Sequence, residues 1–261
     1  MKETVWVRAA QPNEAADVVT VIREAFTQEV IQRTVYGCSG ITAYIKAVLT
    51  ARELVTPTFL VAGWTSQVAA AAEVGVAEDG VFLSYIGTRS AARSKGLGTR
   101  LLLAASELYS SKSDSRMSLD VYQENTRAQD WYRRAGFEVI GERGWWELDL
   151  KGRKQAPAVV SGLPQADLCH REFGFSEIIL HFGGESHRVG RLGTEWFRVT
   201  GLAELDNPAV LAALCSLDPT RKVLALGDPS RTEAARLGAP TMHAFRMQAP
   251  IRRLKETLGS I

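Results

Sequence analysis

The sequence predicts an α/β protein with a mixed, mostly antiparallel sheet flanked by helices, and with a second, smaller α/β domain. Segments typical of strands take turns along the chain with segments whose apolar residues recur at helical spacing. The chain has 261 residues, 46% of them hydrophobic, which is enough for two domains with a core each. A basic segment at 151–157, closed by proline, is typical of an exposed linker between domains 1–150 and 158–261.

The first domain is expected to begin with a strand and a helix. Residues 4–10 are rich in β-branched and aromatic side chains, and Val18, Val21 and Ile22 recur at helical spacing within 15–26. A second periodic stretch predicts a helix over about 40–54. The further strands expected in this domain are 58–64, 68–76, 81–88, 118–122, 137–140 and 145–150, the last two forming a pair, and the further helices are 99–109 and 126–135.

The second domain contains the same kinds of element. Its expected strands are 175–182, 196–200, 223–226 and 241–248, and its expected helices are 208–217 and 229–237. The order of strand, turn, helix and strand over 119–148 recurs over 223–247, which indicates a weak internal repeat. The second domain is therefore interpreted as a degenerate relative of the first domain's second half, without a phosphate loop.

Charge and hydropathy exclude several function classes. The chain has 31 Lys and Arg against 29 Asp and Glu, a net charge of +2, which is too balanced for a protein that neutralises nucleic-acid phosphates. No run approaches the roughly 20 apolar residues that cross a bilayer, and the N-terminus lacks the pattern of a secretion signal. We expect a cytoplasmic protein without a membrane or nucleic-acid partner.

Cysteine and histidine usage predicts no metal site. Cys38, Cys169 and Cys215 are odd in number and far apart, so neither a disulfide framework nor a paired zinc motif is indicated. His181 and His187 are the only histidines near one another, and no acidic partner pattern accompanies them. The cysteines are expected to be reduced and mostly buried.

A glycine loop stands between the strand 81–88 and the helix 99–109. It has the pattern Arg93-x-x-Gly96-x-Gly98, in which glycines allow the backbone to come close to a ligand. Helix-start amides and the helix dipole favour an anion such as a diphosphate there. The pattern matches neither the Walker loop nor the dinucleotide fingerprint. Taken alone, the pattern is weak evidence, and glycines that serve a tight turn before a helix are the alternative explanation.

A second motif follows, Asn125-x-x-Ala128-x-x-Trp131-Tyr132-x-x-x-Gly136-Phe137. Together with the glycine loop about thirty residues earlier, it resembles the GNAT superfamily of acyl-CoA-dependent N-acyltransferases over about residues 4–150. The resemblance implies the GNAT fold for this domain. It implies that the loop holds the diphosphate of CoA, and that the end of the preceding strand offers backbone groups to pantetheine. The residues so implied are Arg93, Ser94, Lys95, Gly96, Leu97, Gly98 and Thr99 in the loop, Ile86, Gly87 and Thr88 on the strand, and Asn125 and Ala128 in the second motif.

The resemblance also suggests catalytic residues. Tyr132 matches the tyrosine that protonates the departing thiolate in many relatives, although a packed aromatic side chain would fit the helix as well. Relatives often have a glutamate on the strand before the loop, but 81–88 contains no carboxylate. Glu73 is the first substitute as general base, with Ser84 or Tyr85 holding a water, and Asp120 is a second choice. Asn125 either contacts the cofactor arm or caps its helix.

The function implied is transfer of an acetyl group from acetyl-CoA to a primary amine, with a small molecule as the default acceptor, by direct attack in a ternary complex. The alternative is a non-catalytic acyl-CoA-binding or regulatory module, which the missing carboxylate and the extra domain favour. No metal is expected to take part. The sequence leaves open the acceptor, the role of 158–261, and whether the protein forms a homodimer.

Overall fold

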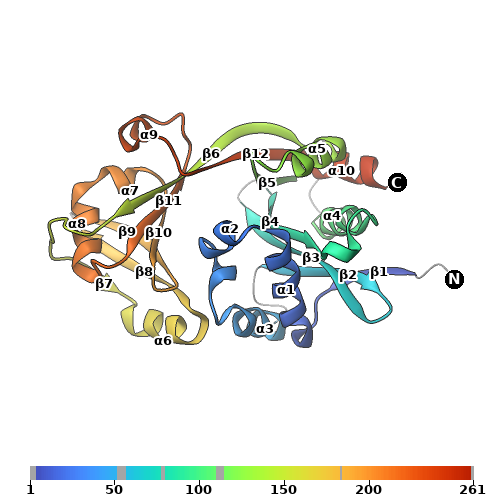
Figure 1. The fold of residues 1–261 in the computed structure, drawn as a ribbon, viewed down its shortest axis with the longest axis horizontal. Coiled ribbons are helices and arrows are strands. Elements are labelled where there is room, and N and C mark those ends of the chain that lie inside the picture. The colour runs from blue at the N-terminus through green and yellow to red at the C-terminus, as the bar shows by residue number, and fades with distance from the viewer. Residues whose placement is uncertain (1–3, 52–56, 78–79, 110–114, 183, 260–261) are drawn as a thin grey trace. The chain divides into compact units, whose positions relative to one another are not determined.

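The computed structural model describes residues 4–51, 57–77, 80–109, 115–182 and 184–259 (Figure 1). The chain forms two compact units. The first consists of Met1–Ile31, Thr42–Ile140 and Phe245–Ile261, and the second consists of Gln32–Ile41 and Gly141–Ala244. The units differ from the predicted domains 1–150 and 158–261, because the C-terminal residues belong to the first unit and a short N-terminal segment belongs to the second.

The sheet of the first unit follows the order β1-β2-β3-β4-β5-β12. Strands β1 to β4 pair antiparallel with their neighbours, and β4 pairs with β5 in parallel. This agrees with the mixed, mostly antiparallel sheet predicted from the sequence. The strands are β1 (Val5–Ala9), β2 (Thr58–Trp64), β3 (Gln67–Ala77), β4 (Gly80–Thr88), β5 (Arg116–Tyr122) and β12 (Met242–Pro250).

The helices of the first unit surround this sheet. They are α1 (Ala15–Ala25), α2 (Gln28–Gln32), α3 (Ile41–Ala51), α4 (Leu97–Leu108), α5 (Thr126–Ala135) and α10 (Ile251–Leu258), with the 3₁₀ turns η1 (Pro12–Glu14) and η3 (Ser90–Ala92). The end of α2 and the start of α3 lie in the residues assigned to the second unit. Positions 52–54 of the helix expected over 40–54 lie outside the described residues.

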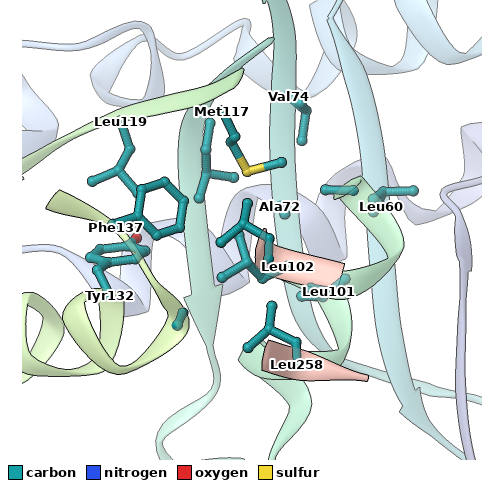
Figure 2. Close-up of a cluster of buried hydrophobic side chains, with 14 of the residues drawn as sticks. Leu60, Ala72, Val74, Leu101, Leu102, Met117, Leu119, Tyr132, Phe137 and Leu258 are labelled. Carbon is teal, nitrogen blue, oxygen red and sulfur yellow. The ribbon is translucent and has the colours of Figure 1, made fainter. Parts of the chain in front are cut away.

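The core of the first unit forms where α4 covers the sheet. Leu101 and Leu102 of α4 are fully buried beside Met117 of β5 (Figure 2). Ile251, Leu254 and Leu258 recur at helical spacing along α10, and all three are buried in the same cluster. Because α10 packs on α4 with this apolar face, the last helix of the chain completes the first unit's core.

The second unit has a sheet of the same construction, in the order β7-β8-β9-β10-β11-β6. Its parallel pair is β10 with β11, and its other pairs are antiparallel. The strands are β6 (Glu138–Asp149), β7 (Val159–Ser161), β8 (Phe175–Phe182), β9 (Glu185–Leu192), β10 (Trp196–Thr200) and β11 (Lys222–Gly227). Its helices are α6 (Leu163–Phe173), α7 (Ala203–Asp206), α8 (Pro208–Leu217) and α9 (Thr232–Leu237), with the 3₁₀ turn η2 (Val35–Gly37).

The strand orders of the two units therefore match strand for strand. The internal repeat indicated by the sequence covered only part of this match, namely 119–148, which overlaps β5, α5 and β6, and 223–247, which overlaps β11, α9 and β12. In the strand order β12 follows β5 and β6 follows β11, so the strands of each unit include one from the predicted domain of the other unit. The strand pair expected over 137–150 was wrong. It is the single strand β6, in which Gly144 continues the antiparallel register with Gly227 of β11.

Candidate functional site

A cavity of about 610 Å³ lies in the first unit, at the end of β4 and the starts of α4 and α5. Most residues implied for CoA binding line it, although they come from three separate segments of the sequence. These lining residues are Ile86, Gly87, Thr88, Arg93, Ser94, Gly96, Leu97, Gly98, Thr99, Asn125 and Ala128. The structure thus brings together eleven of the twelve positions, and Lys95 is the exception.

Lys95 does not line the cavity. Its Nζ atom lies 4.9 Å from the ring centroid of Trp64, which gives the ammonium a cation–π partner instead. Lys95 lies between Ser94 and Gly96, both of which have positive φ, 63° and 78°. The charge of Lys95 is evident from the sequence. The backbone conformations of Ser94 and Gly96, which direct its side chain toward Trp64, are not.

The loop presents main-chain amides to the cavity. Gly96 is the N-cap of α4, and the amide of Arg100 is the first to bond back to it, at 3.1 Å. The amides before Arg100 have no carbonyl one turn earlier, so they are available to an anion. Ser94 has a left-handed backbone conformation, and its Oγ accepts a hydrogen bond of 2.9 Å from Nη2 of Arg127.

Strand β4 has a partly free edge beside the cavity. Its pairs with β5 run from Gly80 to Leu83, whereas its pairs with β3 continue to Thr88. The register with β3 passes from Tyr85 to Leu83, so Ser84 is the extra residue of a β-bulge. The edge of β4 that faces away from β3 is therefore open to a ligand beyond Leu83.

The corresponding strands of the second unit stay paired. All five residues of β10, Trp196–Thr200, pair with β11. The side chain of Leu202 then packs so close to Gly227 that a Cβ atom there would lie 2.4 Å from its Cγ. The open edge of β4 is thus a feature of the first unit that its repeat does not reproduce at β10.

Helix α5 supplies the other wall. Asn125 caps it, because its Oδ1 accepts a hydrogen bond of 3.1 Å from the amide of Ala128. Asn125 also lines the cavity, so both interpretations of this residue fit the geometry. Trp131 donates from Nε1 to Oγ1 of Thr99 at 3.3 Å, which links α5 to the start of α4.

Two arginines on α5 were not predicted from the sequence. Arg127 and Arg134 line the cavity beside Trp131. The three residues are separated by four and then three positions, which puts them on one face of the helix. The sequence contains this signal, since Arg127 comes two residues after Asn125 of the second motif, and Trp131 and Arg134 follow it at helical spacing.

Tyr132 lies in the hydrophobic core and does not line the cavity. Its side chain is 6% exposed and lies beside Phe137 (Figure 2). The ring centroids of Trp131 and Phe137 lie 4.7 and 5.5 Å from that of Tyr132. Burial raises the pKa of its hydroxyl well above the usual value. The sequence offered two interpretations of Tyr132, a proton donor and a packed aromatic side chain. Its surroundings in the structure are those of a packed aromatic side chain.

Glu73 belongs to a cluster of aromatic side chains next to the bulge. It is the cross-strand partner of Tyr85, whose ring packs edge-on against Phe26 with a centroid distance of 5.8 Å. Burial, together with the negative charge of Glu73, raises the pKa of Tyr44 on α3. Neither Glu73 nor Ser84 is among the residues that line the cavity.

Asp120, the second choice for a base, is held in an ion pair. Nε of Arg246 on β12 donates to its Oδ1 at 2.5 Å, and Nη2 donates to its Oδ2 at 2.9 Å. Both carboxylate oxygens of Asp120 are therefore engaged by one guanidinium group. The partner strand comes from the far end of the sequence, which local patterns do not reveal.

Residues 31–137 match the family model described as the acetyltransferase (GNAT) family. The chain contains a GNAT acetyltransferase domain. The matched residues include the glycine loop and the whole second motif, so the resemblance seen in the sequence is confirmed. The family match supports acyl transfer as the general activity of this GNAT domain.

Solved structures resemble the chain over both of its halves. A GCN5-related N-acetyltransferase from Sphaerobacter thermophilus has a TM-score of 0.62 and 15% identity, covering 95% of this chain and 96% of its own. A tandem GNAT protein from the clavulanic acid biosynthesis pathway has a TM-score of 0.65 and 14% identity, covering 95% and 99%. At these identities the likeness shows a shared fold only. It extends over nearly the whole chain, so it includes the residues that follow the GNAT domain. No curated protein matches the sequence.

Two further observations concern the predicted partners. Within the described ranges, no helix combines the length and apolar character needed to cross a membrane. Within the same ranges, no three His, Cys, Asp or Glu side chains gather as a metal-binding group. Cys38 and Cys215 are buried and Cys169 is exposed.

Proposed function

We propose that the GNAT domain transfers an acetyl group from acetyl-CoA to a primary amine of a small molecule, by direct attack in a ternary complex. One observation supports this above the others. A single cavity joins a loop of helix-start amides, the arginine Arg93 and the open edge of β4. This combination suits a ligand with a diphosphate at one end and an amide-bearing arm at the other.

In this proposal the diphosphate binds the amides of Ser94–Thr99, where the α4 dipole and the Arg93 guanidinium stabilise negative charge. The pantetheine arm runs along Ile86–Thr88 and bonds to backbone groups of β4 that β5 does not use. The thioester then lies near the point at which β4 and β5 separate, beside the bulge at Ser84. Holding it there turns a bimolecular attack into an effectively unimolecular one.

The reaction forms a bond from the amine nitrogen to the acetyl carbonyl carbon and breaks the carbon–sulfur bond. A proton must leave the amine, and the departing thiolate must take one up. We assign the first proton to Glu73, acting through a water held near Ser84 or Tyr85, since this carboxylate lies on the strand next to the bulge. Backbone amides beside the bulge would polarise the carbonyl.

The proton for the thiolate is assigned to Tyr132, which adjoins the cavity residue Trp131. Its raised pKa keeps the hydroxyl protonated, the form that an acid needs, but also makes proton release harder. An acid role therefore requires the bound thioester sulfur to approach the hydroxyl.

The test is release of free thiol from acetyl-CoA across a panel of primary amines, paired with calorimetric binding of CoA. We expect binding, and release that depends on the amine. In Glu73→Gln, we expect turnover to fall roughly a hundredfold while CoA affinity stays unchanged, because Glu73 does not line the cavity. Glu124→Gln, an exposed carboxylate before α5, serves as the control and should keep full turnover.

A second candidate is a non-catalytic acyl-CoA-binding module. It is favoured by the fact that no aspartate or glutamate is among the described residues lining the cavity, and that Tyr132 is enclosed in the core. The two candidates give different results in the same experiment. Tight CoA binding without thiol release for any amine would support the binding module, and absence of binding would contradict both.

A further inference from the structure

The cavity carries an unbalanced positive charge. Arg93, Arg127 and Arg134 line it, and no aspartate or glutamate is among its described lining residues. Charges of one sign along a concave wall strengthen one another's field, and they favour a ligand of opposite charge. Three guanidinium groups exceed what one diphosphate at the loop requires, because main-chain amides and the helix dipole already stabilise that anion.

Two of these arginines form a group of their own on α5. Arg127 and Arg134 lie on one face of the helix, with Trp131 between them. Arg93, in contrast, lies before α4, and its Nη2 donates to the backbone carbonyl of Glu24 at 3.3 Å. The cavity therefore has one cation on the loop side and two on the α5 side.

The arginines on the α5 side are not neutralised by carboxylates. Arg127 donates to the hydroxyl of Ser94, and Arg134 forms neither an ion pair nor a hydrogen bond with any described residue. Arg133, the residue before Arg134, has an acidic partner and lies outside the cavity lining. It pairs with Asp130 at 3.0 Å, donates to Gln129 at 3.2 Å, and does not line the cavity.

A CoA thioester carries two separate anionic groups, the diphosphate and a phosphate monoester on the ribose. We propose that Arg127 and Arg134 form a second anion subsite, which binds the ribose phosphate monoester while the loop binds the diphosphate. The inference rests on the proposed function, since it assumes a CoA thioester in the cavity. It makes the protein selective for CoA over the same molecule with a free ribose hydroxyl.

The test compares binding of CoA and 3′-dephospho-CoA by calorimetry, using the full-length protein. We expect the native protein to bind CoA roughly tenfold more tightly or better, since a hydrogen bond between charged groups is among the stronger ones. In Arg134→Gln this ratio should fall toward one, because CoA affinity drops and 3′-dephospho-CoA affinity stays the same. Arg127→Gln should reduce the ratio as well, and Arg134→Lys should restore part of it.

Arg133→Gln is the matched control, because it removes the same charge from the same helix without changing the cavity wall. It should leave the ratio unchanged. Equal affinities of the native protein for the two ligands would overturn the inference while leaving the proposed function intact. So would an Arg134→Gln variant that weakens both ligands equally. If neither ligand binds the native protein, the proposed function fails together with the inference.

Discussion

Gly98 lies directly against the indole ring of Trp131, so that a Cβ atom at position 98 would lie 3.4 Å from Cζ2 of the ring. A methyl group fits at this distance, but a branched side chain does not. We expect Gly98→Val to weaken CoA binding at least tenfold, because its methyl groups must displace Trp131 or enter the cavity. Overpacking of this kind also costs about 1–3 kcal/mol of stability. Calorimetry and thermal unfolding measure the two effects.

Gly98→Ala is the control for this prediction, since its single methyl makes an ordinary contact with the ring. Gly96→Ala adds a useful comparison. Its Cβ atom would meet nothing within 4 Å, but φ is 78°, a conformation that costs an alanine about 1 kcal/mol. If Gly98→Val bound CoA as tightly as Gly98→Ala, the wall formed by Gly98 and Trp131 would not be in contact with CoA.

Tyr132→Phe tests the proposed proton donor. If the hydroxyl protonates the thiolate, turnover should fall about a hundredfold with CoA affinity nearly unchanged, because the ring does not line the cavity. The phenylalanine keeps the contacts with Trp131 and Phe137, so the folded state should be preserved. Steady-state kinetics across pH, with CoA binding measured in parallel, gives both quantities. Turnover equal to that of the native protein at every pH would rule out the acid role.

The local signals in the sequence were sufficient for most elements and for the place of the glycine loop between β4 and α4. Strand 58–64 and helix 126–135 match β2 and α5 to the residue. The loop residues could be predicted because glycine and helix-start chemistry act over a few neighbouring positions. The twelve implied binding positions came from the resemblance to the GNAT superfamily, and eleven of them line one cavity.

What the sequence did not reveal depends on distant partners. Strand β12 was expected, but nothing within 242–250 indicates that it lies beside β5, more than a hundred residues earlier. The engagement of Asp120 by Arg246 follows from that pairing. The direction of Lys95 likewise depends on Trp64 of β2, which local spacing does not bring near the glycine loop.

Glu14 makes stability depend on pH. Its carboxylate accepts two hydrogen bonds of 2.7 Å from Arg8 and one of 2.8 Å from the amide of Gln11. The bond with Arg8, and then the one with Gln11, hold the pKa of Glu14 below its usual value of 4.5, against the effect of burial. A lowered pKa in the folded state means that this stabilisation is complete above about pH 4.5 and is lost as the pH falls below it.

We therefore expect Glu14→Gln to lower the free energy of unfolding by about 1–3 kcal/mol at pH 7, and by progressively less below pH 4.5. Urea unfolding at pH 7, 5 and 3.5 measures the difference. Glu142→Gln, an exposed position on β6, should show no such trend. A deficit for Glu14→Gln that is the same at all three pH values would mean that the ion pair does not set the pH dependence.

Gly40 tests the packing of the segment 32–41 in the second unit. A Cβ atom at this position would lie 2.2 Å from the carbonyl oxygen of Glu172 and 2.5 Å from Cα of Phe173, so the obstacle is backbone that cannot rotate away. We expect Gly40→Ala to lower the free energy of unfolding by about 3 kcal/mol, at the upper end of overpacking costs. Gly141→Ala, where a Cβ atom meets nothing within 4 Å, is the matched control. Equal urea midpoints for the two variants would mean that the backbone of Gly40 does not lie against the end of α6 in solution.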